Sequence, residues 1–192
     1  MFVDSTVPAV LAALAPVLRR CGDRWYVFGA QAVAIWGHPR MSADLDITAA
    51  ILSSHDEFVT AMQGAGFDLR VDGWRAFLDR TRVLPFVHRA TGLPLDIVIA
   101  GPGLEDEFLD RATKVEIAGF SVPVISPEDL VVTKVLAGRT KDLEDIRTIL
   151  EQQLPDLDLL RIRSLIDLLQ QALSRSDLSP VFETLLVAAQ GG

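Results

Sequence analysis

Cysteine is almost absent from this sequence, because its 192 residues include a single one, Cys21. A lone cysteine cannot form a disulfide within the chain, which excludes the disulfide framework that stabilises many small secreted proteins. A reduced thiol fits a reducing compartment. We interpret Cys21 as a packed residue near the end of a helix.

A hydrophobic run long enough to cross a membrane is also missing. The stretch VPAVLAALAPVL at 7–18 is shorter than the roughly 20 residues that a spanning helix needs. Asp4 precedes it, and Arg19 and Arg20 follow it, which reverses the charge order of an export signal. We therefore expect an amphipathic first helix in a cytoplasmic protein that has no membrane partner.

Positive charge is scarce, with 18 lysines and arginines against 26 aspartates and glutamates and a net charge of −8. This balance excludes a surface that binds nucleic acid over its whole extent, because phosphate binding depends on clustered basic residues. Residues 70–89 are a local exception, with five arginines against two aspartates. They form either a solvated face of a helix or loop, or a patch that binds RNA. The arginines are Arg70, Arg75, Arg80, Arg82 and Arg89.

The apolar content is sufficient for a real core. Hydrophobic residues make up 49% of the chain and charged residues 23%, which is typical of a folded globular protein and not of a disordered one. The length suits one domain, or a core domain with a smaller appendage.

Strand and helix patterns alternate in the first two thirds of the chain. A β-prone run at 25–28 leads through Gly29 into helix formers at 31–36, and a second strand is expected at 45–50. An amphipathic helix is expected at 54–65. Further strand patterns cover 83–87, 93–100, 115–120 and 122–125.

The pattern changes at Ser126. Serine is a preferred helix cap, Pro127 suits the first helical position, and helical periodicity then continues towards the end of the chain. We therefore predict an α/β core with a mixed sheet and flanking helices over residues 1–125, followed by a helical portion over residues 126–192.

Three aspartates stand out in the α/β part. Asp44 and Asp46 are two residues apart and so share one face of a strand, while Asp96 is the only charge in the apolar strand at 93–100. Taken singly, Asp96 could pair with a nearby arginine, and Asp44 and Asp46 could form a solvated strand edge. Taken together, three carboxylates on neighbouring strands can hold one or two Mg²⁺ ions.

These residues carry a resemblance. The order Gly29-Ala30-Gln31, Asp44-Leu45-Asp46 and a later Asp96 resembles the pattern of the nucleotidyltransferase superfamily, and the run RMSADLDI is similar to its RxTxDIDI version. Lys134, Arg139, Lys141, Asp142 and Asp145 match the spacing of the helix signature of the AbiEii-like nucleotidyltransferase toxins and their relatives. The resemblance covers residues 25–150.

The resemblance implies a Mg²⁺-dependent nucleotidyltransferase fold and site. Asp44, Asp46 and Asp96 would be the catalytic residues and metal ligands. The helical portion would complete the nucleotide site, in which Asp142 orients Lys134 or the nucleotide. The implied nucleotide-binding residues are Gly29, Ala30, Arg40, Ser42, Lys134, Arg139 and Asp142.

The implied function is the transfer of a nucleotide from an NTP, such as ATP or CTP, to an acceptor hydroxyl of an RNA such as tRNA, or of a protein. The protein would be the toxin of a toxin–antitoxin pair and would bind an antitoxin protein. Two alternatives stay open. One is an antibiotic-modifying nucleotidyltransferase, since such enzymes are similar to the same core. The other is a catalytically inactive binding module, which Ala30 favours and the three intact carboxylates oppose.

Overall fold

The computed structural model describes residues 6–40, 42–117 and 119–191, without the side chain of Asp23. Asp4 and Met41, which belong to the sequence patterns above, lie outside the described residues. The chain divides into two compact units, one formed by residues 1–31 and 41–125 and the other by residues 32–40 and 126–192.

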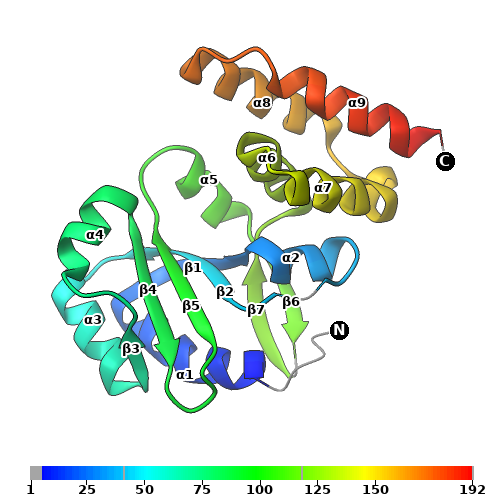
Figure 1. Ribbon diagram of the computed structural model, residues 1–192. Helices are drawn as coiled ribbons and strands as arrows, with labels where there is room; N and C mark the ends of the chain where they lie inside the picture. The colour runs from blue at the N-terminus through cyan, green and yellow to red at the C-terminus, as the bar shows by residue number, and fades with distance from the viewer. Residues whose placement is uncertain (1–5, 41, 118, 192) are drawn as a thin grey trace. The chain divides into compact units, whose positions relative to one another are not determined.

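The first unit is built on a seven-stranded mixed sheet with the strand order β3-β4-β5-β2-β1-β7-β6, as Figure 1 shows. The pairs β2–β5 and β1–β7 are parallel, and the other four pairs are antiparallel. A mixed α/β sheet followed by helices confirms the predicted fold class. The strands are β1 (Gly22–Phe28), β2 (Leu45–Ile51), β3 (Phe67–Leu69), β4 (Val83–His88), β5 (Pro94–Ile99), β6 (Thr113–Ile117) and β7 (Phe120–Val124).

Helices pack on this sheet and close its core. Helix α1 (Thr6–Cys21) contacts β1, β2 and α3 (His55–Gly64), while α5 (Leu104–Arg111) also packs on β1 and β2. Ser54 caps α3, because its side chain accepts a hydrogen bond from the Glu57 N–H. Three elements of this unit are not among those that the sequence pattern predicts, namely β3, α4 (Trp74–Thr81) and α5.

The centre of the sheet has an apolar face and a face that carries the aspartates. Leu45 and Ile47 of β2, and Leu95 and Ile97 of β5, are fully buried. Asp46 lies between Leu45 and Ile47 in the same strand, so its side chain points to the opposite face of the sheet. The alternation that buries the core thus also determines the side on which the carboxylates lie.

The second unit is helical. Ser126 caps α6 by accepting a hydrogen bond from the Asp129 N–H, and Pro127 occupies the first helical position, as the sequence predicts. Gly138, which has a φ of 63°, caps the C-terminal end of α6. The helices are α6 (Pro127–Ala137), α7 (Thr140–Gln153), the short 3₁₀ helix η1 (Leu154–Asp156), α8 (Leu159–Leu173) and α9 (Leu178–Gln190).

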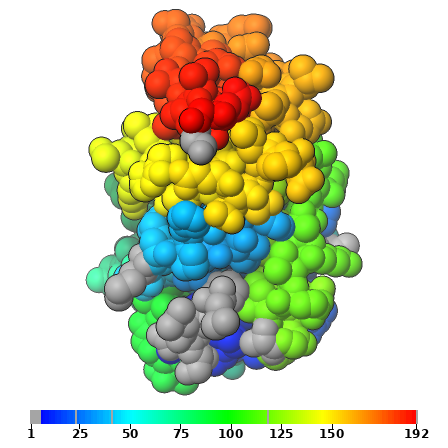
Figure 2. All heavy atoms as spheres, turned by 90° about the vertical axis from the view of Figure 1, so that its right-hand side faces the viewer, coloured from blue at the N-terminus to red at the C-terminus, as the bar shows by residue number. Residues whose placement is uncertain are grey.

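Residues 32–40 belong to this helical unit, although the sequence-based division places them in the α/β part. Helix α2 (Gly29–Trp36) therefore begins in one unit and ends in the other. Figure 2 shows the segment at 32–40, in light blue, against α7, in yellow. The reason is side-chain pairing, because the His38 ring bonds Gln152 at 3.0 Å and Arg40 pairs with Asp145 at 2.7 Å.

None of the helices in the described ranges combines the length and the apolar character that crossing a membrane requires.

Candidate active site

The three aspartates singled out by the sequence converge. In the parallel β2–β5 pair Asp46 lies directly opposite Asp96, so the two side chains point to the same face of the sheet. Asp44 precedes β2 by one residue and Asp46 by two. Asp44, Asp46 and Asp96 each offer one carboxylate oxygen, and these oxygens lie within 4.8 Å of one another.

Gly29 gives Asp46 the space that it occupies. A Cβ atom at Gly29 would stand 2.0 Å from Asp46 Oδ2 and 2.9 Å from its Cγ, and Gly29 has a φ of +65°. The Asp46 carboxylate therefore lies against the backbone at the first residue of α2, where the exposed N–H groups and the helix dipole favour a negative charge. The next residue, Ala30, is buried.

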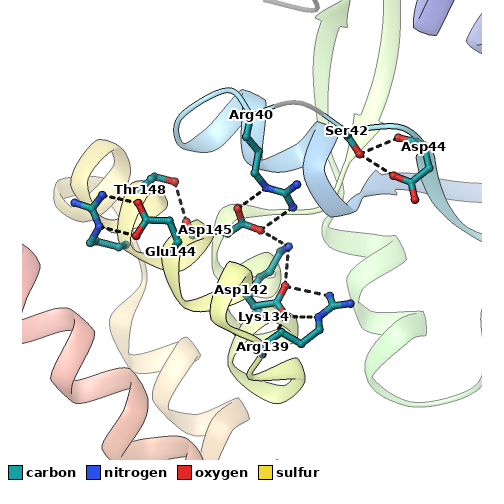
Figure 3. Close-up of polar contacts among 10 residues, drawn as sticks. Arg40, Ser42, Asp44, Lys134, Arg139, Asp142, Glu144, Asp145 and Thr148 are labelled. Atoms are coloured by element: carbon teal, nitrogen blue, oxygen red, sulfur yellow. Dashed lines mark hydrogen bonds and ion pairs between the residues drawn. The ribbon is translucent and has the colours of Figure 1, made fainter.

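Ser42 fixes the orientation of Asp44. Its hydroxyl donates a hydrogen bond to Asp44 Oδ1 at 2.7 Å and lies 3.3 Å from the Asp44 carbonyl oxygen, as Figure 3 shows. The family resemblance implies that Ser42 binds the nucleotide. The hydrogen bonds place this hydroxyl beside the carboxylate that precedes β2.

Arg70 joins the carboxylate cluster. The sequence indicated only that Asp96 could pair with one of the nearby arginines. One guanidinium N–H donates to Asp96 Oδ1, and Nε donates to the carbonyl oxygen of Phe86 at 2.8 Å. Both partners stay accessible, with 35% of the Arg70 side chain and 32% of the Asp96 side chain exposed. Asp96 thus pairs with an arginine inside the cluster and not away from it.

The donor set fits a divalent hard cation. All three ligating groups are carboxylates, and oxygen ligands of this kind suit Mg²⁺ and not the metals that prefer sulfur or imidazole. The oxygens are close enough for one ion to draw them together. Within the described ranges, this is the one group of three or more His, Cys, Asp or Glu residues with such spacing.

A second polar cluster lies within the helical unit and centres on Lys134. Its ammonium group lies 3.1 Å from Asp142 Oδ1 and 2.6 Å from Asp145 Oδ2. The three side chains are 8%, 0% and 2% exposed, so the ion pairs are shielded from water. Figure 3 shows the ammonium group between the two carboxylates.

Two arginines complete this cluster. Arg139 Nε donates to Asp142 Oδ2 at 2.6 Å, and Arg40 Nε donates to Asp145 Oδ1 at 2.7 Å. Burial alone would raise the pKa of both carboxyls. Hydrogen bonds from Arg139 and Lys134 lower the pKa of Asp142 below its ordinary value, and those from Arg40 and Lys134 do the same for the pKa of Asp145.

The predicted nucleotide-binding residues are divided between the two units. Gly29, Ala30 and Ser42 belong to the sheet unit, and Arg40, Lys134, Arg139 and Asp142 belong to the helical unit. Asp145 is as central to the second cluster as Asp142, although the predicted site residues did not include it. Its signal was the spacing of three residues after Asp142, which places both side chains on one helix face.

The arginines of 70–89 do not form an open basic patch. Four of the five contact a carboxylate, which leaves much less uncompensated positive charge than the sequence alone indicates. The pairs are Arg70–Asp96, Arg75–Asp56, Arg82–Glu105 and Arg89–Asp68. Of the two interpretations of this segment, the contacts favour the solvated, paired surface.

A groove of about 980 Å³ lies in the sheet unit between α1 and α3. Small residues such as Ala12, Ala61 and Gly64 line much of it, and the three aspartates do not. The carboxylate cluster is therefore separate from this groove.

Comparison with known proteins agrees with this geometry. The profile of the DUF6036 family, described as nucleotidyltransferase of unknown function, matches residues 11–179. A search of curated proteins gave no match.

Solved structures share the fold at low sequence identity. The antibiotic-resistance factor ANT(2'')-Ia superposes with a TM-score of 0.61 at 14% identity, over 90% of this chain and 95% of that one. An antigenic nucleotidyltransferase-like protein from Paracoccidioides brasiliensis gives 0.54 at 18% identity, over 91% of both chains. The lincosamide antibiotic adenylyltransferase LnuA gives 0.53 at 12% identity, over 77% of this chain and 96% of that one.

Proposed function

The chain belongs to the DUF6036 family of nucleotidyltransferases, and we propose that it is a Mg²⁺-dependent enzyme that transfers a nucleotide from an NTP to an acceptor hydroxyl. The observation that carries this proposal is the convergence of Asp44, Asp46 and Asp96 within 4.8 Å. Three carboxylates this close repel one another, and a divalent cation is the common way to offset that repulsion.

Asp44, Asp46 and Asp96 would hold the ion, which would offset the charge on the entering and leaving oxygens of an in-line displacement. The acceptor oxygen bonds to the α-phosphorus, and the bond from that phosphorus to the leaving pyrophosphate breaks. Asp96 would help the acceptor hydroxyl to lose its proton, which passes to water. Ser42 keeps Asp44 oriented, and the absence of a side chain at Gly29 lets Asp46 lie at the first residue of α2.

The helical unit would supply the phosphate contacts. An ammonium group has three N–H donors, and Asp142 and Asp145 take two of those of Lys134. We propose that the third donor binds a phosphate oxygen. Arg139 has 61% of its side chain exposed while it pairs with Asp142, which suits a guanidinium that also contacts the nucleotide.

For the acceptor, we propose an RNA such as tRNA, or a protein, modified by a toxin that an antitoxin protein holds in check. The support is the spacing of Lys134, Arg139, Asp142 and Asp145, which resembles that of the toxin group. The buried ion pairs among these residues give that spacing a physical reason.

Antibiotic modification is the second candidate. The fold is similar to those of ANT(2'')-Ia and LnuA. The net charge of −8 favours a cationic acceptor, and most arginines of 70–89 are paired. Expression in a drug-sensitive host separates the candidates, because growth arrest supports the toxin and raised tolerance of an aminoglycoside or a lincosamide supports drug modification.

The direct test incubates the purified protein with Mg²⁺ and each of four α-labelled NTPs, with total tRNA, with protein extract and with a panel of antibiotics. We expect label transfer from one or two NTPs, and loss of transfer in the Asp44→Ala and Asp46→Asn variants. If no NTP binds by calorimetry and no label moves, the proposed function is wrong. A growth phenotype that survives both substitutions would indicate a binding module instead.

A further inference from the structure

Arg70 lies in a row of opposite residues that crosses the sheet. The other members of the row are Pro85, Asp96 and Asp46. Phe86 pairs with Leu69, and the Arg70 N–H donates to the Pro85 carbonyl at 2.9 Å, which extends the β3–β4 ladder by one residue. Pro85 lies opposite Asp96, and Asp96 lies opposite Asp46. Residues directly opposite one another point to the same face of a sheet. The side chain of Arg70 is therefore directed along the row towards the carboxylates.

Pro85 explains how Arg70 reaches Asp96. Proline has no N–H, so Pro85 cannot donate a hydrogen bond to the Arg70 carbonyl. The β3–β4 pairing therefore stops here, and β3 ends at Leu69. The proline ring is also small and lies between the two partners. Arg70 must span two strand spacings, or roughly 10 Å, and only a long side chain can do so. Its fork then bonds two acceptors, the Phe86 carbonyl and Asp96 Oδ1.

We propose that Arg70 is a positioning residue that fixes Asp96 and sets the number of metal ions which the site binds without nucleotide. This inference rests on the proposed function. Arg70 occupies Oδ1 of Asp96, so one oxygen of this carboxylate remains for a metal. It also offsets one of the three formal negative charges, and the two that remain match a single divalent ion. A second ion binds only with an NTP, whose phosphates bring further negative charge.

Arg89 offers a matched control, because it repeats the same contacts at the other end of the β3–β4 ladder. Its N–H donates to the Gly66 carbonyl, and its guanidinium bonds the Gln63 carbonyl and Asp68. It thus joins a backbone carbonyl to an aspartate as Arg70 does, but Asp68 is outside the carboxylate cluster. Loss of Arg89 removes equivalent contacts without touching the site.

The experiment titrates the full chain with Mn²⁺ as the probe, by calorimetry and by the EPR signal of free Mn²⁺, without nucleotide. We expect one ion for the wild type and for Arg89→Met, and two for Arg70→Met. We expect one again for Arg70→Met combined with Asp96→Asn, because the second ion needs the released carboxylate. Arg70→Lys keeps the charge and binds one ion.

Activity adds a second measurement. With NTP present, Arg70→Met should lower kcat at least about tenfold while KM for the NTP changes less than about threefold, because Asp96 loses its orientation and the phosphate contacts remain. Arg70→Lys should recover part of kcat, since lysine restores one of the two bonds.

The outcomes separate the two proposals. Equal Mn²⁺ stoichiometry and equal kcat in the wild type and in Arg70→Met overturn the role of Arg70, as do two ions on the wild type without nucleotide. If the wild type binds neither Mn²⁺ nor NTP, the proposed function fails and this inference fails with it. Should Arg70→Met not fold, the Arg70→Lys variant and the wild-type stoichiometry decide the matter.

Discussion

The Cα atom of Gly29 lies so close to Asp46 that an added Cβ would stand 2.0 Å from the carboxylate oxygen Oδ2. The family resemblance implies a different reason for this glycine, namely nucleotide binding. The geometry shows a further reason for a glycine at position 29, because any side chain there would displace the Asp46 carboxylate. The φ of +65° adds a conformational reason, since a residue with a Cβ pays roughly 1–2 kcal/mol there.

The first prediction is that Gly29→Ala lowers nucleotidyl transfer at least about 100-fold, because Asp46 must move. The melting temperature should also fall by several degrees, owing to the strained φ. Steady-state kinetics and thermal unfolding measure the two effects. Gly64→Ala is the control, since nothing lies within 4 Å of a Cβ at that helical position, and it should keep full activity. Equal activities of the two variants would contradict the prediction.

The second prediction concerns the hydrogen bond between Ser42 and Asp44. In Ser42→Ala, Asp44 loses a 2.7 Å bond that orients its Oδ1 atom, and the loss of one such bond corresponds to about 1.5 kcal/mol. We expect the Mg²⁺ concentration for half-maximal activity to rise slightly more than about tenfold, with little change in melting temperature. Activity measured across a Mg²⁺ series tests this.

The control is Ser53→Ala. The Ser53 hydroxyl donates to the Ser54 carbonyl and lies outside the carboxylate cluster, so its loss should leave the Mg²⁺ requirement unchanged. A Ser42→Ala variant with the wild-type Mg²⁺ requirement would show that the hydroxyl does not position Asp44.

Sequence reasoning predicted the carboxylate cluster because its signals are local. Alternation within a strand places Asp44 and Asp46 on one side, and an isolated charge in an apolar strand marks Asp96. The cap at Ser126 is equally local, since it depends on the next few residues alone. Patterns of this kind can be recognised in a sequence without knowledge of the strand order.

Arg70 could not be predicted in the same way. Its contact with Asp96 depends on the register of β3 with β4 and of β4 with β5, and β3 has only three residues, Phe67–Leu69, too few for a clear alternation. The membership of residues 32–40 in the helical unit is non-local too, because it rests on pairing between Arg40 and Asp145, which lie 105 positions apart.

The third prediction tests the buried ion pairs of Lys134. Lys134→Met removes the cation between Asp142 and Asp145, which are 0% and 2% exposed, and leaves both carboxylates less compensated. Loss of one partner of a buried pair costs about 3–5 kcal/mol in the free energy of unfolding. Urea denaturation followed by circular dichroism measures the change.

An exposed ion pair on α7, the helix that carries Asp142 and Asp145, serves as the control for this measurement. Arg147 pairs with Glu144 on the surface of α7, with side chains 45% and 60% exposed. Arg147→Gln should therefore lower the free energy of unfolding much less than Lys134→Met. A similar small loss for Lys134→Met would mean that the buried cluster does not stabilise the helical unit.

The fourth prediction is a loss of stability in acid that originates in the helical unit. Burial opposes ionisation of Asp142 and Asp145, but hydrogen bonds from Arg139, Arg40 and Lys134 prevail, so the pKa of each carboxyl in the folded protein is below its ordinary value. In the unfolded chain each carboxyl titrates near pH 4. The unfolded state therefore binds more protons around and below that pH, and the stabilisation is complete above pH 4 and disappears as the pH falls through the folded-state pKa.

The measurement is the free energy of unfolding from urea titrations between pH 7 and pH 3. The wild type should lose stability steeply below about pH 4, and Asp145→Asn should be less stable at pH 7 but show a shallower decline, because an amide does not titrate. Glu183→Gln is the control, since Glu183 also has a lowered pKa from its arginine partner Arg163 but lies in a half-exposed pair that contributes little. Its decline should follow that of the wild type. Parallel pH profiles for Asp145→Asn and the wild type would place the acid-sensitive groups elsewhere, because only a group whose protonation differs between the two states can bend the profile.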